Sequence, residues 1–288
     1  MITVYGEALV DLVPASASPL APLTPALGGG PFNVARALGR LGADVAFQSR
    51  LSSDAYGAAL RQSLLDAGVD LSLCPSGSEP TTLAVTALRD DGSASYTFYV
   101  NGTADRLAEP VPVADGYAVF GTLSLALEPG SLRYAEAARV SADNGAIVCL
   151  DPNLRPAFSS EKHRLFLRGL LESVTVLKLS DEEVEFLGDT SDVPVVVTTL
   201  GGDGIRVRAP FGVCEVQAPA VEVADTIGAG DTIMAALVHQ FDARGLDRSA
   251  LLTLGEGEWR EILDFAARAA AITVSRTGAD TPYLHELA

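Results

Sequence analysis

Short apolar runs recur along most of the chain and are separated by longer segments with helical periodicity. Each run is rich in valine, leucine or alanine and lacks a regular polar alternation, which is typical of strands buried on both faces of a parallel sheet. The runs cover residues 43–48, 117–121, 146–150, 173–179 and 193–200. We therefore expect these segments to form the strands of a central sheet.

Helical segments lie between these strands. One follows the glycines at 28–30 and ends before Gly42, and two others cover residues 55–67 and 131–144, each followed by a glycine. Glycine is common after the last helical turn because it adopts left-handed backbone angles without steric cost. The alternation of strand and helix predicts a doubly wound α/β fold.

Two segments interrupt this alternation. Residues 81–100 hold two β-rich runs around an Asp-Asp-Gly sequence at 90–92, which is a hairpin pattern. The proline-rich stretch 14–30 is too long for a tight connection. We expect these segments, about residues 12–28 and 72–104, to form a small β lid on an otherwise single-domain chain, with a surface that suits a homodimer.

The composition excludes several classes of partner. The 288 residues carry a formal net charge of -17, and such a protein repels nucleic acid and anionic membranes, whose binding needs a basic surface. No stretch is long and apolar enough to span a membrane, and the first residues lack the pattern of an export signal, so we expect a cytoplasmic protein. The scattered cysteines and histidines lack the spacing of a zinc site or a disulfide framework.

The sequence DTIGAGD at 225–231 places small residues before an apolar helix and a carboxylate on its first turn. A helix N-terminus presents unpaired N–H groups and the positive end of a dipole, so the bare backbone of Gly228, Ala229 and Gly230 suits a bound anion. Asp231 would compete with that anion unless it has its own task, such as accepting a proton from an attacking hydroxyl. A plain glycine-rich turn with an N-terminal helix charge explains the same residues.

Two common phosphate-binding motifs are absent. The chain has neither the lysine-bearing loop of P-loop nucleotidases nor the glycine pattern of dinucleotide-binding folds. Lys162 and Lys178 are its only lysines, and neither follows a glycine. An anionic ligand must therefore be held by arginine, backbone amides or a metal ion.

The segment GGGPFNVARALGRLG at 28–42 suits a polyol. Gly29 and Gly30 let a ligand approach the main chain, and Asn33 offers a donor and an acceptor, although a helix N-cap role for Asn33 is sufficient by itself. Asp11 lies in the apolar run ALVDLV, where burial of an unpaired carboxylate is costly. Either sugar hydroxyls or a local turn would satisfy Asp11.

Three further polar segments follow predicted strands. DPNLRP at 151–156 carries Arg155, which suits a transferring phosphate but equally fits a surface loop. KLSDEEVEFL at 178–187 carries Glu183, either a ligand of a magnesium-bound water or part of an N-terminal helix charge. TLGGDG at 199–204 offers its backbone to a nucleotide or merely turns into a hairpin.

Together these pieces resemble the ribokinase-like (PfkB-type) carbohydrate kinases over nearly the whole chain. The matching segments are GGGPFNVARALGRLG, DPNLRP, KLSDEEVEFL, VTTLGGDGIRV and VADTIGAGDTIMAAL, and GEALVDLVP and GTLSLALEP are most similar to the bacterial fructokinase branch. The resemblance implies a three-layer α/β/α fold with a mostly parallel, doubly wound sheet and a β lid that often joins two subunits. It also implies phosphorylation of a sugar's primary hydroxyl with ATP and Mg2+.

The resemblance assigns roles by position. Asp231 matches the catalytic base, and the amides of 228–230 match the anion hole. Asp11, Gly29, Gly30 and Asn33 match sugar-contacting positions, and Thr199, Gly201 and Gly204 match the nucleotide side. To these we add Arg155 on the substrate side and Lys178 and Ser180 on the nucleotide side. Glu183 matches an acidic residue that holds Mg2+ through water, and Asp225 matches a position near the loop for an activating monovalent cation such as K+.

Three positions depart from the family pattern. Ser180 stands where many members have asparagine, Phe32 replaces a small residue, and Val100 stands where fructokinases often carry arginine. The last two fall on the sugar side, so ribose, 2-keto-3-deoxygluconate and a nucleoside that stacks on the aromatic residues at 96–99 are alternatives to fructose. A non-catalytic sugar-binding protein of the same fold is a further alternative, against which the intact GAGD sequence argues.

Overall fold

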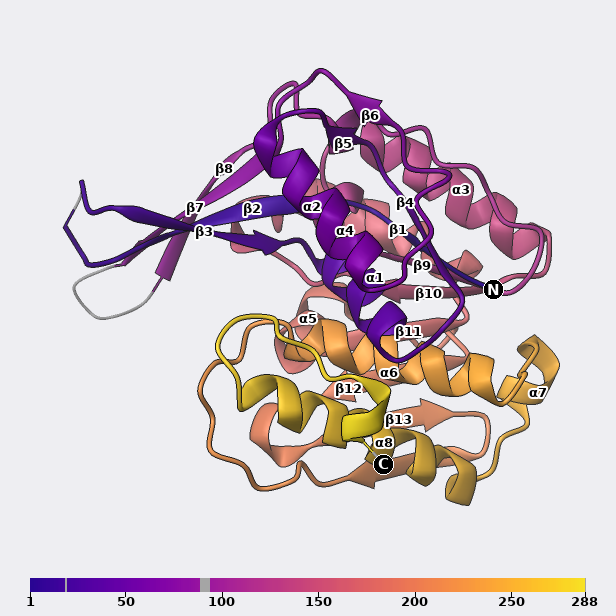
Figure 1. Ribbon diagram of the computed structural model, residues 1–288. Helices are drawn as coiled ribbons and strands as arrows, with labels where there is room; N and C mark the ends of the chain where they lie inside the picture. The colour runs from indigo at the N-terminus through magenta and orange to yellow at the C-terminus, as the bar shows by residue number, and fades with distance from the viewer. Residues whose placement is uncertain (19, 89–93, 288) are drawn as a thin grey trace.

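The computed structural model describes residues 1–18, 20–88 and 94–287 (Figure 1). Its main sheet has eight strands in the order β14-β13-β12-β11-β10-β9-β1-β4. The strands are β1 (Ile2–Tyr5), β4 (Val45–Gln48), β9 (Tyr117–Gly121), β10 (Ile147–Asp151), β11 (Val176–Ser180), β12 (Val195–Thr199), β13 (Ile205–Ala209) and β14 (Gly212–Val216). The predicted turn at 90–92 lies outside the described residues.

The strands from β12 to β4 run parallel, and β13 and β14 add an antiparallel edge. The five apolar runs of the sequence coincide with β4, β9, β10, β11 and β12. They are nearly continuous because both faces of the sheet are covered, so that Val119 of β9 packs into one core and Phe120 into the other. The prediction of a mostly parallel sheet is confirmed.

Helices form a layer on each face of the sheet. Those that share a core with Val119 are α1 (Gly30–Arg40), α2 (Ala55–Asp66), α6 (Ala229–Ala243), α7 (Arg248–Leu252) and α8 (Glu256–Val274). Those that share a core with Phe120 are α3 (Gly130–Asp143), α4 (Glu161–Arg168) and α5 (Asp181–Leu187). The three-layer α/β/α architecture is therefore confirmed. No helix in the described ranges combines the length and apolar content that crossing a bilayer requires.

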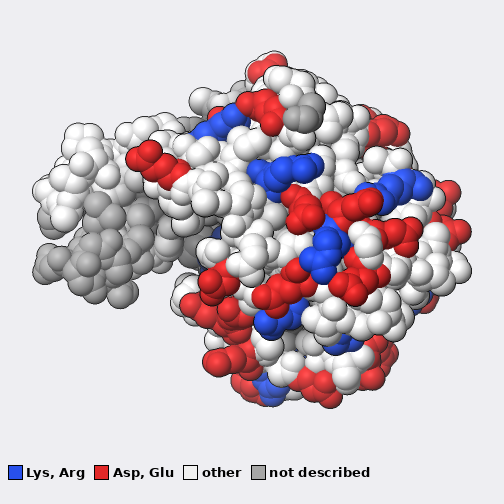
Figure 2. Space-filling view, turned by 90° about the horizontal axis from the view of Figure 1, so that it is seen from below, with Lys and Arg blue, Asp and Glu red and all other residues white. Residues whose placement is uncertain are grey.

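A second sheet projects from this body (Figure 1), with the strand order β3-β2-β7-β8. Its strands are β2 (Leu9–Pro14), β3 (Leu23–Gly28), β7 (Thr82–Leu88) and β8 (Ala94–Tyr99), and two short strands elsewhere, β5 (Leu51–Ser52) and β6 (Ser76–Gly77), form a separate pair. β2 follows β1 closely, so the projecting sheet grows out of the second strand from the β4 edge of the main sheet. Among the residues of its four strands Asp11 is the only charged one, in contrast to the heavily charged body in Figure 2.

Gly39 on α1 lies against the end of α2. A Cβ at this position would overlap the main-chain oxygen of Ala67, so the two helices approach more closely than any other residue permits. Gly257 on α8 is a matched control, because a Cβ there would meet open space.

We expect Gly39→Ala to lower the free energy of unfolding by about 1–3 kcal/mol, because the helices must move apart. Gly257→Ala is expected to leave it unchanged or to raise it by up to about 1 kcal/mol, since alanine favours helix over glycine. Urea denaturation followed by circular dichroism measures both values. Equal changes in the two variants would contradict the close packing at Gly39.

Candidate active site

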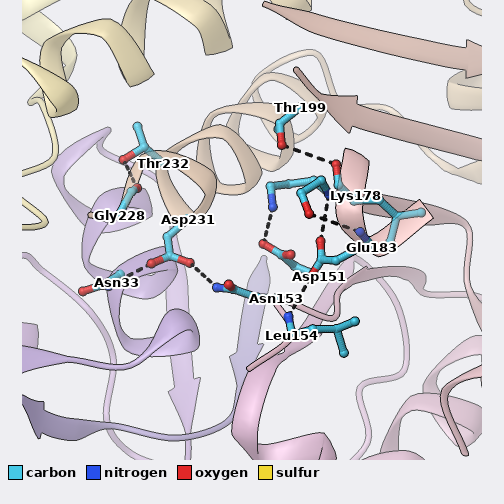
Figure 3. Close-up of polar contacts among 12 residues, drawn as sticks. Asn33, Asp151, Asn153, Leu154, Lys178, Glu183, Thr199, Gly228, Asp231 and Thr232 are labelled. Atoms are coloured by element: carbon cyan, nitrogen blue, oxygen red, sulfur yellow. Dashed lines mark hydrogen bonds and ion pairs between the residues drawn. The ribbon is translucent and has the colours of Figure 1, made fainter. Parts of the chain in front are cut away.

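The carboxyl edge of the main sheet collects the polar segments that the sequence singles out. β10 ends at Asp151, β11 at Ser180 and β12 at Thr199. Because these strands are parallel, their carboxyl ends lie at one edge of the sheet, which is where doubly wound sheets bind their ligands. Side chains from α1, α6 and the strand ends meet there (Figure 3).

Asp231 lies at the centre of this group, on the first turn of α6. It is 6% exposed, its Oδ2 accepts a hydrogen bond from Asn33 Nδ2 at 2.8 Å, and its Oδ1 accepts one from Asn153 Nδ2 at 3.2 Å (Figure 3). Burial raises the pKa of Asp231 above its usual value, against the Asn33 hydrogen bond and the positive charges of Lys178 and Arg155. The result is a fixed carboxylate with a raised proton affinity, which suits a general base.

α6 begins at Ala229 with Gly228 as its N-cap. Gly228 has a φ of 79°, and a Cβ there would lie 2.6 Å from the Cβ of Ala279, so both the backbone angle and the space require glycine. The first N–H groups of an α-helix have no partner within the helix. Ala229 donates its N–H to the main-chain oxygen of Thr226 at 3.3 Å. An anion beside Asp231 would therefore meet the N–H groups of Gly228 and Gly230 first.

Asn33 is not the N-cap of α1, so the interpretation of Asn33 as a helix cap is wrong. The cap is Gly29, with a φ of 109°, and Gly30 is the first helical residue. The helix starts early because the following proline needs no partner for an N–H, and the Asn33 side chain is left to bind Asp231. Gly30 must lack a side chain, because a Cβ would overlap Thr122 Oγ1 and lie 3.4 Å from Asp231 Oδ1.

Arg155 acts on Asp231 through Asn153. Its Nη1 donates hydrogen bonds to Oδ1 of Asn153 at 2.6 Å and to the main-chain oxygen of Asn153 at 3.1 Å. Asn153 has a φ of 41°, which is uncommon for a residue with a side chain, and its amide nitrogen donates to Asp231. Arg155 also influences Asp11 on β2, where burial raises the pKa to about 6 and the charge of Arg155 opposes the rise.

Lys178 and Asp151 form a buried ion pair next to these residues. The distance from Nζ to Oδ2 is 2.7 Å, and each residue is 4% exposed. Burial raises the pKa of Asp151 to about 6, and the charge of Lys178 limits the rise. Burial disfavours the charged form of Lys178, but the carboxylates of Asp151 and Glu183 outweigh it and raise the pKa of Lys178. Each partner thus favours the charged form of the other.

Glu183 and Ser180 form a capping box at the start of α5. Glu183 Oε2 accepts from the Ser180 N–H at 2.8 Å, and Oε1 accepts from the Leu154 N–H at 2.6 Å, which ties the loop after β10 to α5. Both oxygens thus hold a hydrogen bond already. Mg2+ keeps several of its waters in proteins, so a contact through water fits this carboxylate better than direct coordination.

No group of three or more His, Cys, Asp or Glu side chains in the described parts of the chain is arranged to hold a metal ion by itself. Mg2+ in phosphoryl-transfer sites is usually held by one or two carboxylates together with substrate phosphates. A single carboxylate contact at Glu183 is compatible with that arrangement.

Comparison with known proteins decides the family. A sequence model described as pfkB family carbohydrate kinase matches residues 1–286. This chain belongs to the pfkB family. It is therefore a phosphotransferase with an alcohol group as acceptor, and the ribokinase-like fold implied by the sequence motifs is confirmed.

Several relatives of this pfkB kinase are fructokinases. The fructokinase of Escherichia coli is 30% identical over 300 residues, which cover 97% of this chain and 95% of the relative. The structure of a Xylella fastidiosa fructokinase with bound ATP has a TM-score of 0.89 at 28% identity and covers 99% of this chain and 96% of that one. A Vibrio cholerae fructokinase in a fructose, ADP and calcium ion bound form has a TM-score of 0.84 at 26% identity and covers 99% and 97%.

The positions predicted for the nucleotide lie mainly along the end of β12. Thr199 Oγ1 donates to the main-chain oxygen of Leu179 at 3.4 Å, and the exposed Gly201 has a φ of 57° in the turn that follows. Gly204 has a φ of 115°, and a Cβ there would overlap the main-chain oxygen of Val216. The positive φ angles are sufficient to explain glycine at both positions. Their contact with a nucleotide stays a prediction for this pfkB kinase.

Asp225, predicted to lie near a monovalent cation, joins two loops at the start of α6. Its Oδ1 accepts from the Ile227 N–H at 3.0 Å, and its Oδ2 accepts from the Gly278 N–H at 2.9 Å. Asp225 therefore holds the segment before Gly228 against the segment after α8. Its effect on a cation stays a prediction.

Some functional contacts of this pfkB kinase have no clear signal in the sequence. The DPNLRP motif places Asn153 after a strand, but nothing in the motif indicates its bond to Asp231, which is 78 residues away. Thr122, with a φ of 62°, lies against Gly30 without any motif of its own. The strand-end position of DPNLRP is the signal that brings Asn153 to the site.

We predict that Asp231→Asn stabilises the protein, and that the gain grows as the pH is raised from about 4 to about 8. The folded-state pKa of Asp231 lies above its unfolded value, so the stability linked to its protonation is present at low pH and is lost as the pH rises. The Oδ1 of Asn33, which has no hydrogen-bond partner among the described residues, can turn to accept from the new amide. Melting temperatures of both proteins across this range measure the gain, and a gain that is constant or falls with pH would refute the raised pKa.

Proposed function

We propose that this protein is an ATP-dependent fructokinase that transfers the γ-phosphate to a primary hydroxyl of the sugar. The observation that carries the proposal is the buried Asp231 carboxylate, held by two amide donors at the N-terminus of α6. A helix N-terminus favours the negative charge of a phosphoryl group, and a carboxylate beside it can take the proton of the attacking hydroxyl. The fructokinase relatives support fructose as the acceptor.

In this mechanism Asn33 and Asn153 fix both oxygens of Asp231 in the position that receives the hydroxyl proton. The N–H groups of residues 228–230 stabilise the charge on the transferring group. Mg2+, held through water at Glu183 and by the phosphates of ATP, would neutralise further negative charge. The projecting sheet of β2, β3, β7 and β8 would act as a lid that keeps water from competing as the acceptor.

The sugar side favours a neutral acceptor over an acidic one. Asp11 brings a carboxylate to the root of the projecting sheet, and Arg155 is already engaged by Asn153. A carboxylate on the substrate would be repelled by Asp11 without a second cation to compensate. These features support fructose over 2-keto-3-deoxygluconate.

A nucleoside acceptor is the second candidate, supported by the aromatic residues of β8. Tyr96 and Tyr99 are 46% and 59% exposed, so their rings are open to a base. Phe98, in contrast, already packs against Phe158 with 5.2 Å between ring centroids. The contact of Phe98 with Phe158 joins the projecting sheet to the body and removes one ring from a stacking role.

Three sequence predictions remain part of this proposal. They are a homodimer through the projecting sheet, activation by a monovalent cation near Asp225, and a cytoplasmic location. The scarcity of charge on the projecting sheet supports the first, since a contact between two copies of it would bury few charges.

The activity is tested by ADP release with ATP, Mg2+ and a panel of fructose, ribose, 2-keto-3-deoxygluconate and adenosine. We expect the largest kcat/KM with fructose, since the carboxylate of Asp11 can accept hydrogen bonds from the hydroxyls of a neutral sugar and would repel an acidic one. A preference for adenosine would mean that the acceptor is a nucleoside. If no acceptor leads to ADP release, the kinase proposal is wrong.

Asp231→Asn is expected to lower kcat by about 100-fold to 10,000-fold, because the amide cannot accept the hydroxyl proton. Binding of ATP and fructose by isothermal titration calorimetry should change little. Asp242→Asn on the same helix is the control, because Asp242 lies near the N-terminal amine rather than at the site. Near-normal turnover of Asp231→Asn would remove its assignment as the base.

A further inference from the structure

The buried pair of Lys178 and Asp151 has no task in the mechanism described so far. Lys178 is one of two lysines, and the other, Lys162, has a side chain that is 86% exposed and pairs with Glu128 on the surface. A buried ion pair is seldom more stabilising than apolar residues of the same volume, because both charges must leave water. The pair therefore calls for an explanation beyond stability.

Lys178 lies directly against the first turn of α6. An ideal Cβ on Gly230 would lie 3.3 Å from Lys178 Nζ and 3.6 Å from its Cε, so glycine at 230 leaves the room that the lysine side chain occupies. Figure 3 shows the ammonium group above Asp151, on the side of Asn153 opposite to Asn33. A buried positive charge is thus held next to the turn that carries Asp231.

The partner carboxylate is only half satisfied. Asp151 Oδ2 receives the hydrogen bond from Lys178, whereas Oδ1 is buried and has no partner among the described residues. Asp151, Gly30, Thr122 and Asp231 line a small cavity of about 10 Å3. A pair selected for stability alone would satisfy both oxygens, since an unpaired buried polar atom is costly.

We propose that Lys178 is a positioning residue for the reaction: clamped by Asp151, its ammonium group stabilises the ionised carboxylate of Asp231 and so keeps the base ready to accept a proton. The inference rests on the proposed function and extends it. It also moves Lys178 from the nucleotide side, where its sequence motif places it, to the base.

The charges that face Asp231 come from three places. Lys178 lies on β11, Asp151 ends β10, and Arg155 lies in the loop after β10, while α1 contributes the neutral amide of Asn33. Arg155 is partly exposed and shares its charge with Asn153, whereas Lys178 is buried. Because charges interact more strongly away from water, Lys178 is the cation that best offsets the burial of Asp231.

The decisive variant removes both charges of the pair. Lys178→Met alone would leave Asp151 unpaired and threaten folding, so we combine it with Asp151→Asn. If Lys178 merely neutralises Asp151, the double variant Lys178→Met/Asp151→Asn will show the wild-type pH dependence of kcat/KM, since no Asp151 charge remains to be neutralised. If Lys178 supports Asp231, the profile will stay altered.

We expect the acidic limb of kcat/KM in the double variant to move to higher pH, because loss of a neighbouring cation raises the pKa of a carboxylate. The simultaneous loss of the Asp151 charge opposes part of this shift. The KM values for ATP and fructose should stay within about threefold of wild type, since the proposal places the pair beside Asp231 rather than against either substrate. Lys162→Met serves as the matched control and should retain the wild-type profile. A wild-type acidic limb in the double variant would overturn the proposal.

A second measurement needs no turnover. Asp231→Asn is introduced into the wild type and into the double variant, and the gain in melting temperature is compared at about pH 9, since a high pH favours the ionised carboxylate. We expect the larger gain in the double variant, because its Asp231 carboxylate has lost its cation. Equal gains would reject the role of Lys178. If the wild type phosphorylates no acceptor, the kinase proposal fails, and this comparison still decides the inference.

Discussion

The central constraint on this structure is the burial of the Asp231 carboxylate, which must be stabilised without water. A buried charge is tolerated when hydrogen bonds and a nearby opposite charge replace the water it has lost. Asp231 obtains its hydrogen bonds from two amides that belong to different parts of the chain, α1 and the loop after β10. The main sheet, its two helical layers and the loop conformations have to be in place before these donors and the carboxylate meet.

Glycines allow the main chain around Asp231 to lie in close contact with neighbouring residues. Gly30 lies against Thr122, Gly228 against Ala279, and Gly230 against Lys178, and in each case a side chain would disturb the site. The neighbours on the other side are held by polar contacts, with Glu183 fixing the loop that carries Asn153. The GAGD and GGGP sequences thus have a packing explanation in addition to the proposed ligand contacts.

The sequence predicts most of the fold because its strands are uninterrupted apolar runs, which only a sheet covered on both faces accommodates. It also predicts that polar loops gather at one edge, because parallel strands end together. It misplaces Asn33 as a possible helix cap, because the start of α1 is set by a glycine and a proline upstream. The bond from Asn153 to Asp231 and the pairing of Lys178 with Asp151 depend on register between distant segments, which no local pattern contains.

The near absence of lysine has a chemical consequence under the proposed function, in which a ketose binds at the site. Open-chain sugars condense with unprotonated amines to form Schiff bases, and a free lysine beside a sugar pocket would be a target for such adducts. The ammonium of Lys178 is paired and has a raised pKa, so it lacks the free electron pair that this reaction needs. The site thereby contains a positive charge that an open-chain sugar cannot glycate.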